Sequence, residues 1–333
     1  MPRLPSEPST HDIPQPSTRQ LLPKSLRYAM EVARVGSVQG AAKTLSLSAS
    51  AIDRQILLLE DDLGVPLFER MPGGMRLTAA GEIVIVLARR WRTDIDHIGL
   101  QIKQLQGVDQ GRLKLAAMDS HTNGFLPLFV ARLARQYPRI QLEIDILSTD
   151  QAVAALVEGT IDIAVAFNVK AQRELHLAWS TGLPLGCIVA PSHALARQAQ
   201  ASLKEVAAYP MAVQGRSLAI RRYLESRHAW LFSEGEPPVV TNSLQLVKKL
   251  VRSGSHVAIT SEVDAAPELI AGELRFIPIR DRDAKPQTVG VAISARRPLP
   301  RIARIAADLL AQEIQDSLQA ARSAQLTRHP KPK

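Results

Sequence analysis

The chain has 333 residues, of which 46% are hydrophobic and 22% charged, so its composition is that of globular domains and its length suits two or three of them. No apolar run approaches the roughly 18 residues that span a bilayer, which excludes a transmembrane helix by this criterion. The formal net charge of +9 does not by itself locate a nucleic-acid-binding part, because residues 25–80 carry six basic and six acidic side chains.

The ends of the chain and its cysteine content suggest where the protein works. Residues 1–24 contain six prolines, and this composition predicts a disordered leader without the basic and apolar segments of a signal peptide. Residues 323–333 resemble the leader in composition and predict a disordered tail. The only cysteine, Cys187, excludes an intramolecular disulfide and a multi-cysteine metal site. We expect a cytoplasmic protein, with Cys187 in a hydrophobic core and no metal or cofactor.

Residues 25–63 have the pattern of three short helices separated by turn signals. Gly36 ends the first helix, since glycine accepts the left-handed conformation common at helix C-termini. Ser37 and Ser48 are suitable N-caps for the second and third helices, the third running to about Asp62. Two helices joined by about three residues form a helix-turn-helix arrangement.

A hairpin and a long helix follow these three helices. The turn signal at residues 72–74, Pro-Gly-Gly, separates two short extended pieces, 67–70 and 75–77, which together predict the wing of a winged helix. Thr78 then caps a helix predicted over residues 79–105, about 40 Å long at about 1.5 Å per residue.

This long helix carries apolar residues at steps of three and four, which form one continuous seam. Such a helix usually pairs with a partner helix, and packing against its own domain is the alternative. The seam therefore predicts a dimerisation surface made of Ile83, Leu87, Trp91, Ile95, Ile98 and Ile102.

After residue 111, apolar strand-like runs alternate with helical stretches, and the alternation predicts an α/β domain with parallel strands in two similar lobes. A final amphipathic helix is expected over about residues 300–321. The predicted fold class is therefore multidomain α/β, with a winged helix-turn-helix, a long linker helix and a two-lobed domain. The predicted boundaries are 1–24 for the leader, 25–80 for the winged helix-turn-helix, 81–111 for the linker helix and hinge, 112–184 with 262–315 for lobe I, 185–261 for lobe II, and 316–333 for the tail.

The spacing GSV–AA–L–S–S–I–RQI–LE–LG–PLFER–RLT–AG within residues 26–82 closely resembles the DNA-binding domain of LysR-type transcriptional regulators. The segments LPLFVARLARQYPRIQLEI, VEGTIDIAVA and SGSHVAITSEVDAAPELIAGELRFIPI resemble, more loosely, the periplasmic-binding-protein-like effector domain of that family. The resemblance covers about residues 25–315. It implies a regulator that binds double-stranded promoter DNA and a small-molecule effector, forms a homodimer or homotetramer, and contacts RNA polymerase.

The resemblance places the start of the third helix, the recognition helix, in the major groove. Its candidate DNA contacts are Ala49, Ser50, Asp53 and Arg54. Family members usually have glutamine and proline in place of Ala49 and Ser50, and serine in place of Asp53. Alanine offers no hydrogen bond, and Asp53 can accept one from a cytosine amino group, so we expect an atypical half-site with Arg54 as the main positive contact.

Further DNA contacts are expected at the wing and at the helix caps. Arg70 and Arg76 flank the wing turn, where cations suit phosphate or minor-groove contact. Ser37 and Ser48 could donate hydrogen bonds to phosphates, although their role as helix caps alone explains them.

In two-lobed α/β domains, small molecules bind between the lobes, at the carboxyl ends of strands and near helix N-termini. Ser120 matches a family position that often places a hydroxyl at the effector. The overall charge of +8 over residues 112–333 weakly favours an anionic effector. The candidate effector-binding residues are Ser120, His121, Thr122, Ser148, Thr149, Asn168, Arg216, Ser217 and Thr260.

Three other functions remain to be weighed. An enzyme is disfavoured because the sequence has no HExxH, GxxxxGK or GxSxG pattern. A solute-binding protein is disfavoured by the helix-turn-helix and by the lack of a signal-peptide pattern. A regulator that binds DNA but has lost its effector remains open.

Overall fold

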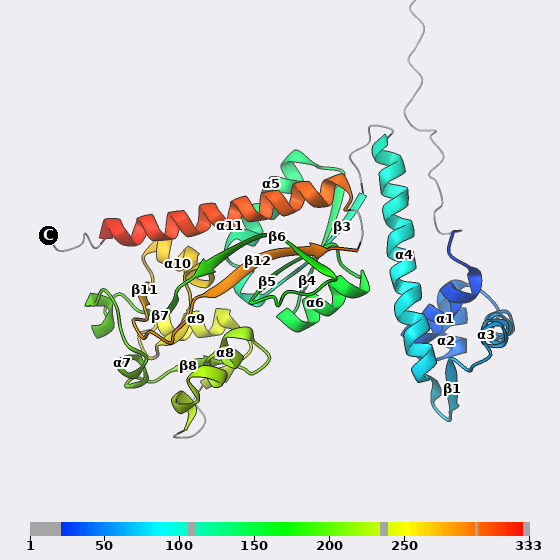
Figure 1. Cartoon of the computed structure of the whole chain (residues 1–333), viewed down its shortest axis with the longest axis horizontal. Coiled ribbons are helices and arrows are strands. Elements are labelled where there is room, and N and C mark those ends of the chain that lie inside the picture. Colours follow the sequence, from blue (N-terminus) through cyan, green and yellow to red (C-terminus); the bar gives the residue numbers. More distant parts are fainter. Residues whose placement is uncertain (1–20, 106–110, 234–238, 297–298, 329–333) are drawn as a thin grey trace, which may run out of the picture. The chain divides into compact units, whose positions relative to one another are not determined.

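The computed structural model describes residues 21–105, 111–233, 239–296 and 299–328 (Figure 1). The chain is divided into two compact units, residues 1–106 and 107–333. Most of the predicted leader and most of the hinge at 107–111 lie outside the described residues. The last residues of the predicted leader belong to the first unit, because Leu22 is buried and the first helix begins at Lys24.

The first unit contains the predicted helix-turn-helix and wing in the predicted order. Gly36 has a φ of 77°, the left-handed conformation that ends the first helix. Ser37 Oγ accepts from the N–H of Gly40, and Ser48 Oγ accepts from the N–H of Ala51, so both serines are the expected N-caps. The elements are α1 (Lys24–Val35), α2 (Val38–Leu45), α3 (Ala49–Leu63), β1 (Phe68–Met71), β2 (Gly74–Leu77) and α4 (Ala79–Leu105).

Hydrogen bonds from backbone N–H groups hold the wing against the three helices. Glu60 Oε1, on α3, accepts from the N–H groups of Leu67 at 2.7 Å and Phe68 at 3.1 Å. The N–H of Met75 donates to the carbonyl of Gly36 at 2.7 Å. The wing therefore has a fixed position relative to α3, and the carboxylate of Glu60 is used inside the unit.

The second unit contains two groups of strands, which we call lobe I and lobe II. Among the described strands, lobe I has the sheet order β4-β3-β5-β12-β6, and lobe II has the orders β10-β7-β11 and β8-β9. Lobe I consists of β3 (Gly111–Ala117), β4 (Ile140–Ile146), β5 (Ile163–Phe167), β6 (Leu175–Leu183) and β12 (Gln287–Ser294). Lobe II consists of β7 (Leu185–Val189), β8 (Ala212–Gln214), β9 (Val239–Thr241), β10 (Ala258–Ser261) and β11 (Arg275–Pro278).

The strand pairings correct three expectations from the sequence. The sheet of lobe I is mixed and not all parallel, because β12 runs antiparallel to β5 and β6. Strand β6 was not predicted. Lobe II was predicted to end at residue 261, but β11, residues 275–278, pairs with β7 and so belongs to lobe II.

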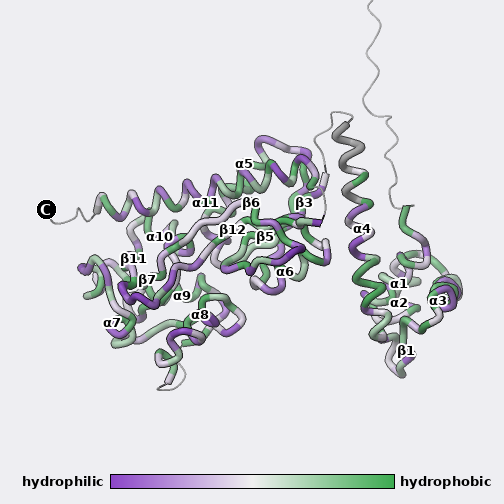
Figure 2. Tube along the Cα trace, viewed as in Figure 1, coloured by the Kyte–Doolittle hydropathy of each residue, from purple (hydrophilic) through white to green (hydrophobic). Residues whose placement is uncertain are grey.

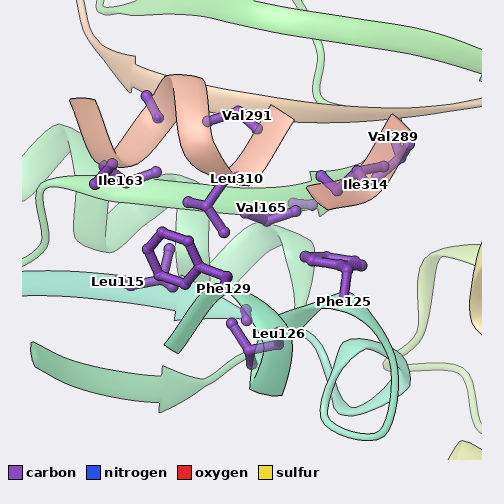
Figure 3. Packing of buried hydrophobic residues seen from close by; sticks show 14 of the residues in the cluster. Leu115, Phe125, Leu126, Phe129, Ile163, Val165, Val289, Val291, Leu310 and Ile314 are labelled. Carbon is purple, nitrogen blue, oxygen red and sulfur yellow. The ribbon is translucent and has the colours of Figure 1, made fainter. Parts of the chain in front are cut away.

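Helices cover both lobes, and their apolar faces form the cores. In lobe I, Phe125, Leu126 and Phe129 of one helix pack with Leu310 and Ile314 of another in one cluster that includes side chains of the sheet (Figure 3). Figure 2 shows hydrophobic residues concentrated along β5, which lies in the middle of that sheet. The helices are α5 (Phe125–Gln136), α6 (Thr149–Glu158), α7 (Leu203–Ala207), α8 (Ala219–Arg227), α9 (Leu244–Arg252), α10 (Ala266–Ala271) and α11 (Arg301–Arg328).

Helix α11 extends beyond the predicted end at about residue 321 and contacts both lobes. Its first part packs in the core of lobe I, whereas Ala321 is buried in a cluster of lobe II. Arg322 Nε donates to Glu262 at 2.9 Å, and Gln325 Oε1 accepts from the N–H of Phe276. The predicted tail at 316–333 is therefore wrong as far as residue 328, and residues 329–333 lie outside the described part.

Two further expectations concern the core and the membrane. Cys187 is buried in β7, as predicted, and burial raises the pKa of its thiol to about 12. In the described residues, no helix combines the length and the hydropathy that crossing a membrane requires.

Candidate functional site

The start of α3 presents an accessible polar surface. Ser50 and Arg54 are exposed, Asp53 and Ala49 are half-buried, and the opposite face of the helix is anchored in the core by Ile52. Ser50 Oγ donates to Ser48 Oγ at 3.2 Å. Arg54 has no ion-pair partner within the part of the chain that the structure describes. Its guanidinium can therefore meet a nucleic acid without first breaking a contact inside the protein.

Unlike Arg54, the two wing arginines are each paired with a carboxylate. Arg70 Nη2 lies 2.7 Å from Asp53 Oδ1 on α3, and Arg76 Nη2 lies 2.6 Å from Glu69 Oε2 on the paired strand. The register places Glu69 directly opposite Arg76 across the hairpin. All four residues are on the same unit, so each pair neutralises a wing arginine, and no pattern in the sequence predicted the pair of Arg70 with Asp53.

Most of the predicted seam on α4 is exposed in the single chain. Ile83 is 70% exposed, and Leu87, Trp91 and Ile98 are also exposed. Ile95 differs, because it packs partly against the core of the first unit. The side chain of Ile102 lies outside the described residues. The other face of α4 is anchored in the core of the first unit by Ile85 and Ala88, which leaves the seam available to another helix.

A small pocket lies between the lobes of the second unit and encloses about 30 Å³. It holds the space of one or two water molecules, so this conformation is nearly closed. Lobe I contributes Met118, Asp119, Ser120, Phe167 and Gln287, and lobe II contributes Gln214, Leu218, Ala219, Ile220, Leu244, Thr260 and Asp264. Of the nine predicted effector-binding residues, only Ser120 and Thr260 line it.

Asp264 is the centre of a buried polar cluster on the wall of this pocket. Its Oδ2 accepts from Thr260 Oγ1 at 2.6 Å and from Ser261 Oγ at 2.8 Å. Its Oδ1 is buried and accepts no hydrogen bond from the described residues. Burial raises the pKa of Asp264 above its usual range, while the hydrogen bonds from Thr260 and Ser261 and the neighbouring hydroxyl of Ser120 act in the opposite direction.

Asp119 connects the two lobes beside the pocket. Its Oδ2 accepts from the N–H of Leu244 at 2.7 Å, in the first turn of α9. Gln245 Nε2 donates to the carbonyl of Asp119 and to Thr122 Oγ1. A carboxylate at a helix N-terminus is favoured by the free N–H groups and by the helix dipole. Thr122 therefore holds the lobes together and does not line the pocket.

Two of the predicted residues are used for internal support. His121 is buried against Phe125 and Phe167, its Nδ1 accepts from the N–H of Met118, and burial lowers its pKa to about 3. Thr149 Oγ1 donates to the carbonyl of Phe167. These two side chains stabilise lobe I and lie behind the pocket wall.

Four other predicted residues also lie outside the lining. Ser148 caps α6. Asn168, which has a φ of 52°, donates from Nδ2 to Gln287 Oε1 at 3.2 Å and so orients a residue that does line the pocket. Arg216 is exposed and pairs with Glu225, and Ser217 is exposed.

Sequence reasoning missed most of the polar lining. Asp119 and Gln214 lie in segments that follow predicted strands. In these segments, the neighbouring residues Ser120, Arg216 and Ser217 were predicted to bind the effector instead. Asp264 had a usable signal, since Ser261 and Asp264 have the spacing of a capping box after a predicted strand. Gln287 begins β12 and had no local signal.

Comparison with protein families matches both units. The model described as bacterial regulatory helix-turn-helix protein, lysR family, matches residues 23–82, and the model described as LysR substrate binding domain matches residues 106–315. Similar solved structures include CbnR bound to its target DNA, at a TM-score of 0.58 and 22% identity over 88% of this chain and 99% of that one. A full-length OxyR variant from Pseudomonas aeruginosa has a TM-score of 0.61 and 22% identity over 87% and 93%.

Curated relatives agree with the family models. A probable nitrogen assimilation transcriptional activator of Synechococcus elongatus is 31% identical over 71% of this chain and 77% of its own length. The transcriptional regulator CysB of Burkholderia cenocepacia is 27% identical over 76% and 82%. The chain therefore belongs to the LysR family of bacterial helix-turn-helix regulatory proteins, with an N-terminal DNA-binding domain and a C-terminal effector-binding domain.

Proposed function

We propose that this protein is a cytoplasmic homodimer that binds operator DNA through α3 and the wing and changes transcription when a small molecule binds between lobes I and II. Effector binding would favour one arrangement of the dimer, or of a tetramer built from two dimers, and so alter the contact with RNA polymerase. The physical requirement is only that the effector has different affinities for the two arrangements.

The observation that carries the DNA-binding part is the exposed, unpaired Arg54 in the second turn of α3. An arginine in the N-terminal half of a recognition helix can donate two hydrogen bonds to a guanine edge. Ser50 is exposed one turn before it, and Asp53 is half-buried next to it. These three side chains support a base-reading surface, and the paired Arg70 and Arg76 flank it on the wing.

The exposed seam of α4 supports the dimer. A helix with Ile83, Leu87, Trp91 and Ile98 in solvent leaves a large apolar stripe uncovered. Pairing with the same helix of a second copy would bury this stripe along a continuous seam. A two-fold dimer would also present two recognition helices, which matches an operator with two symmetric half-sites.

The relatives support transcription as the regulated process. They include proteins named as a transcriptional activator of nitrogen assimilation and as the RuBisCO operon transcriptional regulator. The similar solved structures include CbnR in complex with its target DNA. Because these relatives control different genes, they support the mode of action and leave the target genes to experiment.

Fluorescence anisotropy with the intergenic DNA beside the protein's own gene tests the proposal. We expect binding tighter than to shuffled DNA of the same composition, and weakening by about 10- to 100-fold in Arg54→Ala. Lys204→Ala is the matched control, because it removes one exposed positive charge from the second unit. Equal affinity for intergenic and shuffled DNA would contradict sequence-specific binding to this DNA, and an unchanged Arg54→Ala would contradict the base-reading role.

A further inference from the structure

The interlobe pocket has an unusual charge for a site that was expected to hold an anion. Among its described lining residues, six are apolar, four are neutral amides or hydroxyls, and two are the carboxylic acids Asp119 and Asp264, with no lysine, arginine or histidine. An anionic ligand would lose its hydration there without gaining a counter-charge. The net charge of the whole domain therefore does not describe its pocket.

The basic residues near the pocket are already paired. Lys248 is buried, with its Nζ 2.8 Å from Glu268 Oε1 and 3.2 Å from the carbonyl of Asp264. Arg222 pairs with Asp150 across the lobes at 3.2 Å. Arg216 and Arg221 both pair with Glu225. Turning Lys248 or Arg222 into the pocket would leave Glu268 or Asp150 without this partner, and turning either Arg216 or Arg221 would break its pair with Glu225.

The N-terminus of α9 is also occupied. It is a place where a ligand carboxylate would ordinarily find free N–H groups. Asp119 Oδ2 already accepts from Leu244 there, at 2.7 Å. A ligand carboxylate would have to displace this side chain and would then lie beside its negative charge, so the protein's own carboxylate excludes it.

Three groups in the pocket still lack hydrogen-bond partners. Asp264 is 94% buried, and neither its Oδ1 nor the buried Oγ of Ser120 has a hydrogen-bond partner among the described residues, so a ligand can donate to Oδ1 there. On the opposite wall, α8 begins at Ala219 after Leu218, which provides no side-chain cap. The N–H groups of Ala219 and Ile220 have no acceptor within the helix, so they need an acceptor from a ligand.

We propose, on the basis of the function proposed above, that the pocket binds an uncharged amphipathic molecule that donates an N–H or O–H group to Asp264 Oδ1. Its oxygen accepts from the first turn of α8, and its apolar part packs against Phe167, Leu218 and Leu244. A primary amide has this combination, with donor and acceptor on one uncharged group. The negative charges of Asp119 and Asp264 disfavour carboxylates and other anions in this pocket.

The size of the pocket adds a requirement for opening. At about 30 Å³ it holds only a few atoms, so a larger ligand enters when the lobes separate. The contacts that such a movement breaks first are those of Asp119 with Leu244 and of Arg222 with Asp150. Ligand binding and lobe movement are then the same event, which is the coupling that regulation requires.

Thermal unfolding of the full-length protein with matched probes tests the ligand class. Each set contains a primary amide, a carboxylate and an amine on the same short aliphatic or aromatic skeleton. We expect amides to raise the Tm by about 2–4 °C when present at several times their Kd, and the matched carboxylates to give no rise. Stabilisation by carboxylates, by amines alone, or by none of the probes would overturn the proposal.

Substitutions then assign the effect to Asp264. Asp264→Asn presents an amide where the unpaired oxygen lies, so the amide probes should lose their effect and carboxylates should gain one. Asp308→Asn, at an exposed position on α11, is the matched control and should leave the ranking unchanged. If Asp264→Asn does not fold, the comparison of amide with carboxylate probes in the unsubstituted protein still tests the proposed ligand class. Operator binding measured on the same preparation separates the two proposals, because intact DNA binding with a carboxylate preference contradicts only this one.

Discussion

Asp53 and Arg70 join the recognition helix to the wing through a contact of 2.7 Å between Oδ1 and Nη2. Arg70 is 66% exposed, and an exposed pair of this kind contributes only about 0–1 kcal/mol to stability. The pair therefore matters more for DNA recognition than for stability. The carboxylate holds the guanidinium against α3 and cancels a positive charge that would otherwise face phosphates.

Replacement of Asp53 by Asn should therefore strengthen binding to DNA of any sequence and reduce the difference in affinity between intergenic and shuffled DNA. The change removes one negative charge and frees Arg70, so the slope of log K against log salt should become steeper by about 1. Anisotropy titrations with intergenic and shuffled DNA across a salt series would measure both effects. Asp61→Asn removes an exposed carboxylate near the other end of α3 and should change neither. Weaker binding of both DNAs by the Asp53 variant would show that the pair has a different role.

The dimer depends on the exposed seam of α4 in this account. Ile83→Asp should convert the dimer to a monomer with little change in stability of the single chain, because this side chain is 70% exposed. Light scattering after size-exclusion chromatography would measure the mass. Leu21→Asp also replaces an exposed aliphatic side chain by aspartate, at a position outside α4 that is 61% exposed, and this control variant should remain dimeric. A dimeric Ile83 variant would move the interface elsewhere.

Gly81 should tolerate no side chain at the start of α4. A Cβ there would lie 2.0 Å from the carbonyl oxygen of Leu67, so Gly81→Ala must displace the helix or the wing. We expect a loss of about 1–3 kcal/mol in the stability of the first unit, measured by urea unfolding. Gly73→Ala is the comparison, because nothing lies within 4 Å of a Cβ at that position. Equal stability of the two variants would be inconsistent with the packing described.

The stability of the second unit should fall in mild acid because of His121. The pKa of this side chain is about 3 in the folded state and about 6.5 when unfolded, so the unfolded chain binds the proton more strongly. The contribution is complete above pH 6.5 and is lost as the pH falls toward 3, by about 1.4 kcal/mol per pH unit at its steepest. His121→Asn cannot titrate in this range and should flatten the profile of urea unfolding between pH 6.5 and 4. An unchanged slope would assign the acid sensitivity to other groups.

The end of α11 should stabilise lobe II, although its sequence resembles a tail. A chain that ends at Ala321 loses the partner of the buried carboxylate of Glu262 and the acceptor for the N–H of Phe276. We expect a loss of about 1–3 kcal/mol for leaving these groups unsatisfied. A chain that ends at Arg328 keeps both contacts and should be as stable as the full length. Thermal unfolding of the two truncated forms would decide, and equal Tm values would contradict the role of these contacts.

The first unit was predictable because its signals are local. Gly36, Ser37 and Ser48 mark helix ends by their own backbone and capping preferences, and Thr78 caps α4 as expected. The exposed start of α3 followed from the same boundaries. The contact of Asp53 with Arg70 was not predictable in this way, because it joins residues 17 positions apart through the packing of the wing.

The second unit depends more on contacts between distant segments. Strand β6 has a weakly alternating sequence, LHLAWSTGL, and is an edge strand defined by its pairing with β12. Two pocket residues, Asp264 and Gln287, come from segments whose positions depend on how the chain crosses between the lobes. The predicted hydroxyl side chains at strand ends have the right chemistry for a ligand site, since Ser120 and Thr260 line the pocket. Most of the others cap helices or bond to the backbone and do not reach it.

Selection of binding sites from randomised DNA tests the central claim most directly. The account predicts that the full-length protein enriches two half-sites related by two-fold symmetry, and that Arg54→Ala loses the preference at one position in each half-site while Asp53→Asn relaxes it. A pool that shows no enrichment over random DNA, or a single unpaired site that is unaffected by Arg54→Ala, would contradict a dimeric regulator that reads its operator through α3.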